Sequence, residues 1–186
     1  MLMKFIDTEF PEVKLISSDI FSDLRGCFFG VYEKDLFSKN GIDENFSQDS
    51  ISYSEGNVVR GLHFQNPNSQ GKLVCPVHGD IYDVVVDIRI GSPNFKKWIS
   101  LELRSGDGSM LWIPPGFAHG FATLTQNTWL LYKFTNMWDP KGEYVINWKD
   151  PDLAIQWPFD HPTMSERDKN APNLVNIDKL PLLQTD

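Results

Sequence analysis

Short apolar runs recur along the chain, each separated from the next by glycine, proline, asparagine or aspartate. From residue 46 onward these runs occupy residues 46–53, 57–64, 72–78, 80–89, 96–103, 109–113, 120–125, 128–135 and 143–148. Runs of this length bounded by turn residues are typical of β-strands. Many of them in succession predict an all-β fold, a sandwich, jelly roll or barrel.

Helices are expected at only two places. Residues 33–41 end in an Asn-Gly pair suited to closing a helix, and they predict the one short helix before residue 150. Upstream, Asp-Leu-Arg-Gly at 23–26 interrupts two apolar alternations and predicts a strand, a turn and a strand. The proline-containing tail after Pro158 is predicted to be irregular, with one short helix near residues 165–168.

The predicted strand at 80–89 has two different faces. Because side chains alternate along a strand, one face consists of Tyr82, Val84, Val86 and Ile88, and the other of Asp83, Val85, Asp87 and Arg89. The face with two aspartates and an arginine either meets solvent or lines a polar cavity.

Length and composition are those of a folded soluble protein. The 186 residues can enclose a substantial core and predict a single domain over residues 1–186. No apolar run approaches the roughly 20 residues needed to span a bilayer, and the N-terminus lacks the long apolar core of a signal peptide. We therefore expect a cytoplasmic protein that is not bound to a membrane.

The overall charge argues against one class of partner. Seventeen basic and 25 acidic residues give a net charge of -8, which repels nucleic acid. An anionic ligand would therefore need locally concentrated positive charge, and Arg60, His63 and Lys72 provide it between predicted strands, with Arg25 as a possible addition. These groups repel one another unless an anion binds, which favours a ligand site over a structural role for His63.

Two kinds of chemistry find little support. The histidines form no His-x-His pair, and Cys27 and Cys75 show no metal-binding spacing, so we predict no metal, no cofactor and free thiols. No Gly-x-Ser-x-Gly elbow or phosphate loop is present. Proton transfer remains, since a histidine base, a tyrosine acid and a cation that stabilises negative charge suffice to move a proton next to a carbonyl.

The other candidate residues also have structural interpretations. His119 lies in a Pro/Gly-rich turn and could be a packed histidine. Periodicity alone makes Tyr132 a core strand residue, and Asp168 in a polar tail an ordinary surface charge. Trp138 could pack against its neighbours or form a platform for a nucleotide base.

A set of segments identifies a resemblance to a known family. They are Arg-Gly-Leu-His-Phe-Gln at 60–65, Gln-Gly-Lys-Leu at 70–73, Asp-Val-Val-Val-Asp-Ile-Arg at 83–89 with Ser-Pro at 92–93, Leu-Trp-Ile-Pro-Pro-Gly-Phe-Ala-His-Gly-Phe at 111–121 and Tyr-Lys-Phe-Thr-Asn at 132–136. These segments resemble the dTDP-4-dehydrorhamnose 3,5-epimerase family. The similarity extends from Asp-Leu-Arg-Gly at 23–26 to Ser-Glu-Arg-Asp at 165–168 and so covers nearly the whole chain.

The resemblance implies a fold and an activity. It implies a metal-free cupin, which is a double-stranded β-helix or jelly roll, usually found as a homodimer. It also implies an epimerase that inverts C3 and C5 of a nucleotide-linked 4-keto sugar. Both inversions would pass through an enolate, because the C4 carbonyl acidifies the protons on both neighbouring carbons.

The resemblance also implies roles for individual residues. His63 would be the base, paired with Asp168, and Tyr132 would deliver a proton to the opposite face of the sugar. Lys72 would stabilise the enolate oxygen, oriented by Asp83. The implied substrate-binding residues are Arg25, Gln48 and Arg60 on the diphosphate, His119 in the sugar pocket, and Phe28, Asp83 and Trp138.

Departures from the family pattern concern the nucleotide. Gly30 stands where the family often has a glutamate near thymine, and Trp138 where it often has a tyrosine that stacks on the base. The usual Asn-His is also missing around residues 48–51. A larger ring and a missing carboxylate are compatible with a purine, so a GDP-linked 4-keto heptose of the kind used in capsule pathways competes with the dTDP hexose as substrate.

Other functions on this fold also stay open. A C3-only or C5-only epimerase, or a 4-keto-sugar isomerase, would use the same residues with a differently shaped pocket. A non-catalytic sugar-nucleotide binding module would need no acid-base pair. Product analysis and solvent deuterium exchange separate these alternatives.

Overall fold

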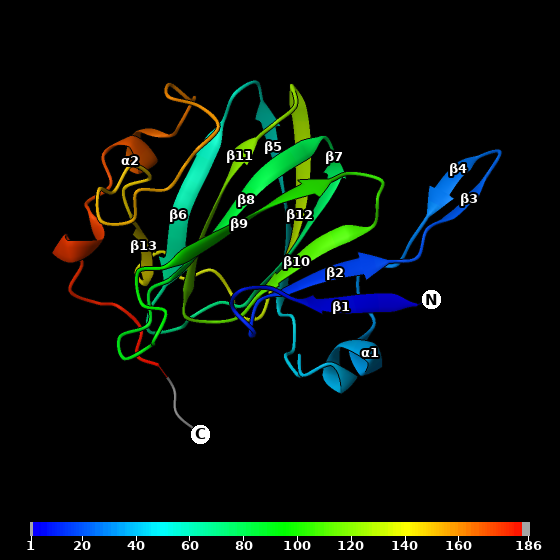
Figure 1. Ribbon diagram of the computed structural model, residues 1–186, viewed down its shortest axis with the longest axis horizontal. Coiled ribbons are helices and arrows are strands. Elements are labelled where there is room, and N and C mark those ends of the chain that lie inside the picture. The colour runs from blue at the N-terminus through cyan, green and yellow to red at the C-terminus, as the bar shows by residue number, and fades with distance from the viewer. Residues whose placement is uncertain (1, 184–186) are drawn as a thin grey trace.

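The computed structural model describes residues 2–183, and two antiparallel sheets that face each other form its centre (Figure 1). The strands of the six-stranded sheet are β1 (Met3–Asp7), β2 (Lys14–Ser18), β5 (Gln48–Glu55), β7 (Lys72–His78), β10 (Ser109–Ile113) and β12 (Asn127–Phe134). Those of the five-stranded sheet are β6 (Val59–Gln65), β8 (Asp80–Asp87), β9 (Trp98–Arg104), β11 (Phe117–Thr123) and β13 (Glu143–Val145).

The order of the strands gives the fold its class. The six-stranded sheet runs β1-β2-β10-β7-β12-β5, and the five-stranded sheet runs β13-β6-β11-β8-β9. From β5 to β8, and again from β10 to β13, the chain changes sheet at every connection. This winding is that of a double-stranded β-helix, so the predicted all-β jelly roll is confirmed.

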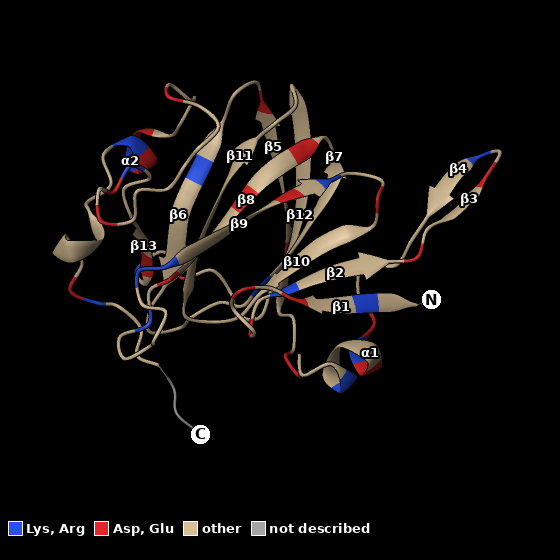
Figure 2. Cartoon of the chain, in the orientation of Figure 1, with Lys and Arg blue, Asp and Glu red and all other residues tan. Residues whose placement is uncertain are grey.

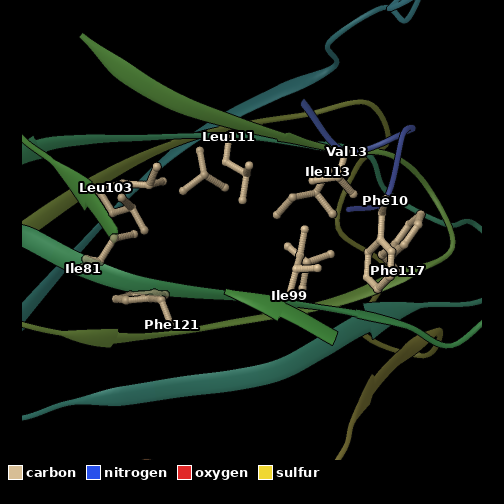
Figure 3. Packing of buried hydrophobic residues seen from close by; sticks show 12 residues of the cluster. Phe10, Val13, Ile81, Ile99, Leu103, Leu111, Ile113, Phe117 and Phe121 are labelled. Carbon is tan, nitrogen blue, oxygen red and sulfur yellow. The ribbon is translucent and has the colours of Figure 1, made fainter. Parts of the chain in front are cut away.

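The main hydrophobic core fills the space between the sheets. Figure 3 shows Ile81 and Phe121, from the five-stranded sheet, below Leu111 and Ile113 from the six-stranded sheet. All four are almost completely buried, and Tyr132 packs against the same cluster. Burial of apolar surface from both sheets holds them together. Phe121 of this cluster, and Tyr132 packed against it, also line a cavity between the sheets.

Strand β8 is buried on both faces. Asp83 and Val85 point between the sheets, and both are 0% exposed. On the other face, Val84 and Val86 pack against the C-terminal segment, through residues such as Leu153. The polar face of β8 therefore lines the interior and does not meet solvent.

Irregular segments and short helices cover the sheets. Helix α1 (Lys34–Lys39) buries Phe37 against the outer face of the six-stranded sheet. The tail contains α2 (Glu166–Lys169) and the 3-10 turn Leu174–Asn176, and is otherwise irregular. Both predicted helices are thus present. No described helix has the length and apolar character needed to cross a membrane.

Part of the outer face of the six-stranded sheet stays uncovered. Ile51 and Tyr53 on β5, Trp129 on β12 and Val77 on β7 are between 42% and 60% exposed. The tyrosine and tryptophan rings lie 4.9 Å apart. We call these four side chains the β5–β12 patch.

A small hairpin projects from the body of the molecule. It consists of β3 (Phe21–Asp23) and β4 (Gly26–Phe28), and Figure 1 shows it extending beyond the end of β2. Phe21, Leu24 and Phe28 are 55%, 107% and 65% exposed. The predicted strand–turn–strand is confirmed, but its apolar side chains have no cover within the described chain.

Candidate active site

A cavity of about 270 Å³ lies between the sheets beside the main core. The predicted site residues that line it are Gln48, Arg60, His63, Lys72, His119, Tyr132 and Trp138. They come from five strands and from the segment after β12. The fold thus brings together side chains that the sequence places far apart.

His63, on β6, is paired with Asp168 of α2. Its Nε2 lies 2.9 Å from Asp168 Oδ1, and the Gly61 amide donates to the other carboxylate oxygen at 3.3 Å. Burial alone would raise the pKa of Asp168, but the His63 ring and the Gly61 amide hold that pKa below its usual value. In a neutral His63 ring, the ionised carboxylate favours the tautomer with its proton on Nε2, so the lone pair is on Nδ1 and would be available for general-base catalysis.

The Asp168 carboxylate is fixed in place by the start of α2. Ser165 is the N-cap residue of this helix, and its hydroxyl accepts a hydrogen bond from the Asp168 amide at 3.1 Å. Asp168 is only 4% exposed. The polar tail therefore contributes a buried partner for His63 rather than a solvated charge.

A second histidine–carboxylate pair lies beside the first. His119 is the register partner of His63 on the neighbouring strand β11, and its Nε2 lies 2.8 Å from Asp83 Oδ2. Burial lowers the pKa of His119, although Asp83 acts in the opposite direction. The imidazole is therefore neutral near pH 7, and it can exchange hydrogen bonds with a sugar hydroxyl without adding charge.

Lys72 is a buried cation on the opposite sheet. Its Nζ donates to the His63 carbonyl at 3.1 Å, and the residue is 6% exposed. Burial lowers the pKa of Lys72 to about 8, while the charges of Glu143 and Asp83 favour the ammonium form. Lys72 is therefore mostly protonated at neutral pH but close to its titration point.

Asp83, which the resemblance gives as the residue that orients Lys72, is hydrogen-bonded to a different side chain. Asp83 bonds to His119 because the two side chains project from neighbouring strands of one sheet, whereas Lys72 comes from the facing sheet. Asp83 Oδ1 is buried and has no hydrogen-bond partner among the described residues. Asp83 thus acts on Lys72 through its charge.

Tyr132 projects from β12 toward the same cavity. Its hydroxyl lies 3.2 Å from Ser52 Oγ on β5. Burial raises the pKa of Tyr132, with the Ser52 hydrogen bond acting weakly in the opposite direction. The phenol therefore carries its proton at neutral pH and can give it to a strongly basic carbanion or enolate.

The two walls of the cavity differ in chemistry. His63 and His119 belong to the five-stranded sheet, and Lys72 and Tyr132 belong to the six-stranded sheet. A ligand between the sheets would meet a base on one face and a proton donor on the other. This geometry allows a proton to leave one face of a carbon and another to arrive on the opposite face.

The mouth of the cavity combines positive charge with an exposed aromatic ring. Arg60 forms the single charged band on β6 in Figure 2, and its guanidinium donates to Ser54 Oγ at 3.1 Å and to the Tyr53 carbonyl at 2.8 Å. Trp138 is 55% exposed. Gln48, in contrast, uses both ends of its amide on protein atoms, Ser50 Oγ and the Trp138 amide.

Arg25 and Phe28 do not reach the cavity of their own chain. They lie on the projecting β3–β4 hairpin and are absent from the cavity lining. The Arg25 side chain is 90% exposed and pairs with Asp23 at 2.6 Å. The hairpin points away from the sheets, so these two predicted site residues are separated from the other site residues in the described chain.

Sequence reasoning missed Glu143. This residue begins β13 and lines the cavity, and Arg167 of α2 donates hydrogen bonds to its carboxylate and, at 3.1 Å, to its backbone carbonyl. Burial would raise the pKa of Glu143, but the side chains of Arg167 and Trp138 hold that pKa below the usual value. In the sequence Glu143 was only the first residue of a predicted strand, and no spacing linked it to the site.

Comparison with known proteins assigns the family. A model of the dTDP-4-dehydrorhamnose 3,5-epimerase family matches residues 7–176. The chain belongs to this family. A dTDP-4-dehydrorhamnose 3,5-epimerase of Salmonella typhimurium is 44% identical over 176 residues, which cover 93% of this chain and 96% of that protein. One from Neisseria gonorrhoeae is 43% identical over 167 residues, which cover 89% of this chain but only 51% of that protein's length.

Solved structures of family members have the same architecture. The dTDP-6-deoxy-D-glucose-3,5-epimerase of Legionella pneumophila, in complex with dTDP-4-keto-L-rhamnose, has a TM-score of 0.96 at 39% identity and covers 99% of this chain and 100% of its own. A 3'-monoepimerase of Streptomyces bikiniensis, in complex with dTDP-quinovose, has a TM-score of 0.88 at 30% identity, covering 95% and 92%. Membership confirms the predicted enzyme class, an isomerase that epimerises carbohydrates.

Proposed function

We propose that the protein inverts C3 and C5 of a dTDP-linked 4-keto-6-deoxyhexose. The proposal is supported by family membership and by the match to a structure holding dTDP-4-keto-L-rhamnose. The observation that carries it is the position of His63 and Tyr132 on opposite walls of one cavity, which the buried Lys72 also lines. A binding module would need no such acid-base pair.

The proposed reaction begins with His63. The C4 carbonyl acidifies the protons on C3 and C5, and the His63 base, held by Asp168, removes one of them. The electron pair moves to the C4 oxygen, where the Lys72 ammonium stabilises the enolate. Tyr132 then gives its proton to the opposite face of the same carbon, and solvent restores both side chains to their starting states.

The direct test is conversion of purified dTDP-4-keto-6-deoxyglucose. We expect the product to carry inverted configurations at C3 and C5, visible in proton couplings of the sugar ring. Inversion at one carbon alone would favour a monoepimerase, the activity named for the Streptomyces bikiniensis relative. A product with the carbonyl at C3 would instead identify a ketoisomerase.

The pKa of Lys72 predicts the alkaline limb of the pH profile. Burial lowers this pKa to about 8, so the ammonium that stabilises the enolate is lost as the pH rises through that value. We expect kcat/KM to fall above pH 8. Well below pH 8 Lys72 is fully protonated, so its titration should no longer change kcat/KM. In Lys72→Met this limb should vanish, together with about 10²-fold or more of the activity. A limb that persists in Lys72→Met would belong to another group.

One other nucleotide competes with dTDP as the carrier of the sugar. Trp138 offers a larger ring than the tyrosine expected from the family pattern, and Gly30 offers no carboxylate. These two residues are compatible with a purine base, so a GDP-linked 4-keto heptose is the competing substrate. Tighter binding of dTDP than of GDP, measured by calorimetry, would exclude the heptose proposal.

We also propose that the active form is a homodimer in which the hairpin of one chain completes the cavity of the other. The hairpin exposes Phe21, Leu24 and Phe28 to solvent, and the β5–β12 patch exposes a second apolar surface. Pairing in a dimer would bury both and would bring Arg25 to the diphosphate of the partner's substrate.

Subunit mixing tests this assembly. Arg25→Ala and His63→Ala should each be weakly active alone. If the hairpin acts in trans, a mixed dimer has one site with both defects and one intact site. Exchange of subunits should then restore up to about a quarter of the parent activity. If Arg25 acts within its own chain, every mixed site stays defective and no activity returns.

A further inference from the structure

The segment that bears Trp138 is held by two glutamine side chains. Gln65 Nε2 donates to the Met137 carbonyl at 3.3 Å, and the Asp139 amide donates to Gln65 Oε1 at 2.8 Å. Between these two contacts, the Trp138 amide donates to Gln48 Oε1 at 3.0 Å. Three successive residues of this segment are thus each bound through a backbone group.

The two glutamines are themselves anchored on different sheets. Gln65 ends β6 of the five-stranded sheet, is 3% exposed and also donates to the Asn68 carbonyl at 2.8 Å. Gln48 begins β5 of the six-stranded sheet and donates to Ser50 Oγ at 3.0 Å. The segment is therefore fastened to both walls of the cavity.

Further contacts tie the same segment to the loop between β6 and β7. Gln70 donates to the Asn136 carbonyl and Asn136 donates to the Ser69 carbonyl, both at 2.8 Å. The Trp138 side chain is nevertheless 55% exposed. An exposed indole on a fixed backbone keeps more of its orientation than one on a free loop, and so costs less entropy when a planar ligand stacks on it.

We propose that Gln65 and Gln48 are positioning residues that hold Trp138 as a preformed platform for the nucleotide base. This inference rests on the proposed function of the cavity, and it gives Gln48 a role other than diphosphate binding. Gln65 does not line the cavity. Any effect of its substitution on nucleotide binding must therefore pass through the segment that it holds.

Gln65→Met tests the proposal, because methionine has a similar length but cannot form these hydrogen bonds. Binding of dTDP and of GDP would both be measured. For each nucleotide that the parent protein binds, we expect the dissociation constant to rise about 3- to 10-fold in the variant. KM for the nucleotide sugar should rise by the same factor, with kcat within about twofold. Affinity for inorganic pyrophosphate, which has no base, should not change. Gln156→Met, the same change at an exposed glutamine outside the cavity lining, is the matched control.

A double-mutant cycle with Trp138→Ala separates the positioning role of Gln65 from the stacking role of the Trp138 ring. Once the indole is absent, Gln65→Met should weaken nucleotide binding no further. Equal weakening in both backgrounds, or none in the parent, would overturn the positioning role. If Trp138→Ala itself leaves nucleotide binding unchanged, the base platform of the proposed function fails, and the positioning role fails with it.

Hydrogen exchange provides a measurement that needs no variant. The Trp138 and Asp139 amides of the parent protein should exchange at least about 10-fold more slowly than unstructured peptide amides. Exchange at the unstructured rate would overturn the proposal even if Gln65→Met fails to fold.

Discussion

His63→Ala should lower kcat for epimerisation by about 10³-fold. The variant loses the nitrogen that removes the proton and leaves the buried Asp168 carboxylate without its partner at 2.9 Å. Because Arg60 and Trp138 at the mouth are untouched, nucleotide binding should persist. Quenched assays of turnover measure the loss of kcat. Calorimetry measures dTDP binding separately.

A matched histidine provides the control. His78 lies at the exposed end of β7 and does not line the cavity. His78→Ala should keep parent activity and parent thermal stability. If His63→Ala retains more than about a tenth of the parent kcat, His63 is not the base and the proposed acid-base pair is wrong.

Tyr132→Phe should separate proton removal from proton delivery. The substitution removes only the hydroxyl, and the ring can keep its stacking on Phe134, whose centroid lies 5.6 Å away. We expect inverted product to form about 10²-fold more slowly, because no acid faces the enolate from the six-stranded sheet. His63 can still remove a proton and return one from the same face. Substrate recovered from D₂O should therefore acquire deuterium without inversion.

Tyr82→Phe is the corresponding control, since Tyr82 lies on the face of β8 that packs against the C-terminal segment and does not line the cavity. It should behave as the parent protein does. Loss of exchange and inversion together in Tyr132→Phe would contradict the division of roles, because it would make Tyr132 necessary for proton removal.

The jelly roll and the centre of the site were predictable for definite reasons. Alternating apolar positions and turn residues mark strands locally, and the clustered charges of Arg60, His63 and Lys72 need a ligand to offset their repulsion. The pairing of Asp168 with His63 came from the family resemblance, because nothing local marks an aspartate in a polar tail as buried. The structure supplies the cause, a short helix capped by Ser165.

Other features depend on tertiary contacts that leave no local signal. Glu143 reaches the cavity only because β13 pairs with β6, and Asp83 bonds to His119 only because β8 and β11 are neighbours. Arg25 is the opposite case, a residue that the sequence predicted in the site but that the structure places outside it. The family resemblance implies a ligand contact for Arg25, but the hairpin holds this side chain away from the cavity of its own chain. This separation is why we propose that the contact is made across a dimer.

The most direct test of the proposed enolate is deuterium exchange followed by NMR. dTDP-4-keto-6-deoxyglucose and a GDP-4-keto heptose would each be incubated with the protein in D₂O. We predict deuterium at both C3 and C5 of the dTDP hexose, with exchange at both carbons abolished in His63→Ala. Absence of exchange from both substrates, in protein that binds dTDP or GDP, would contradict the account and leave a nucleotide-sugar binding protein without this chemistry.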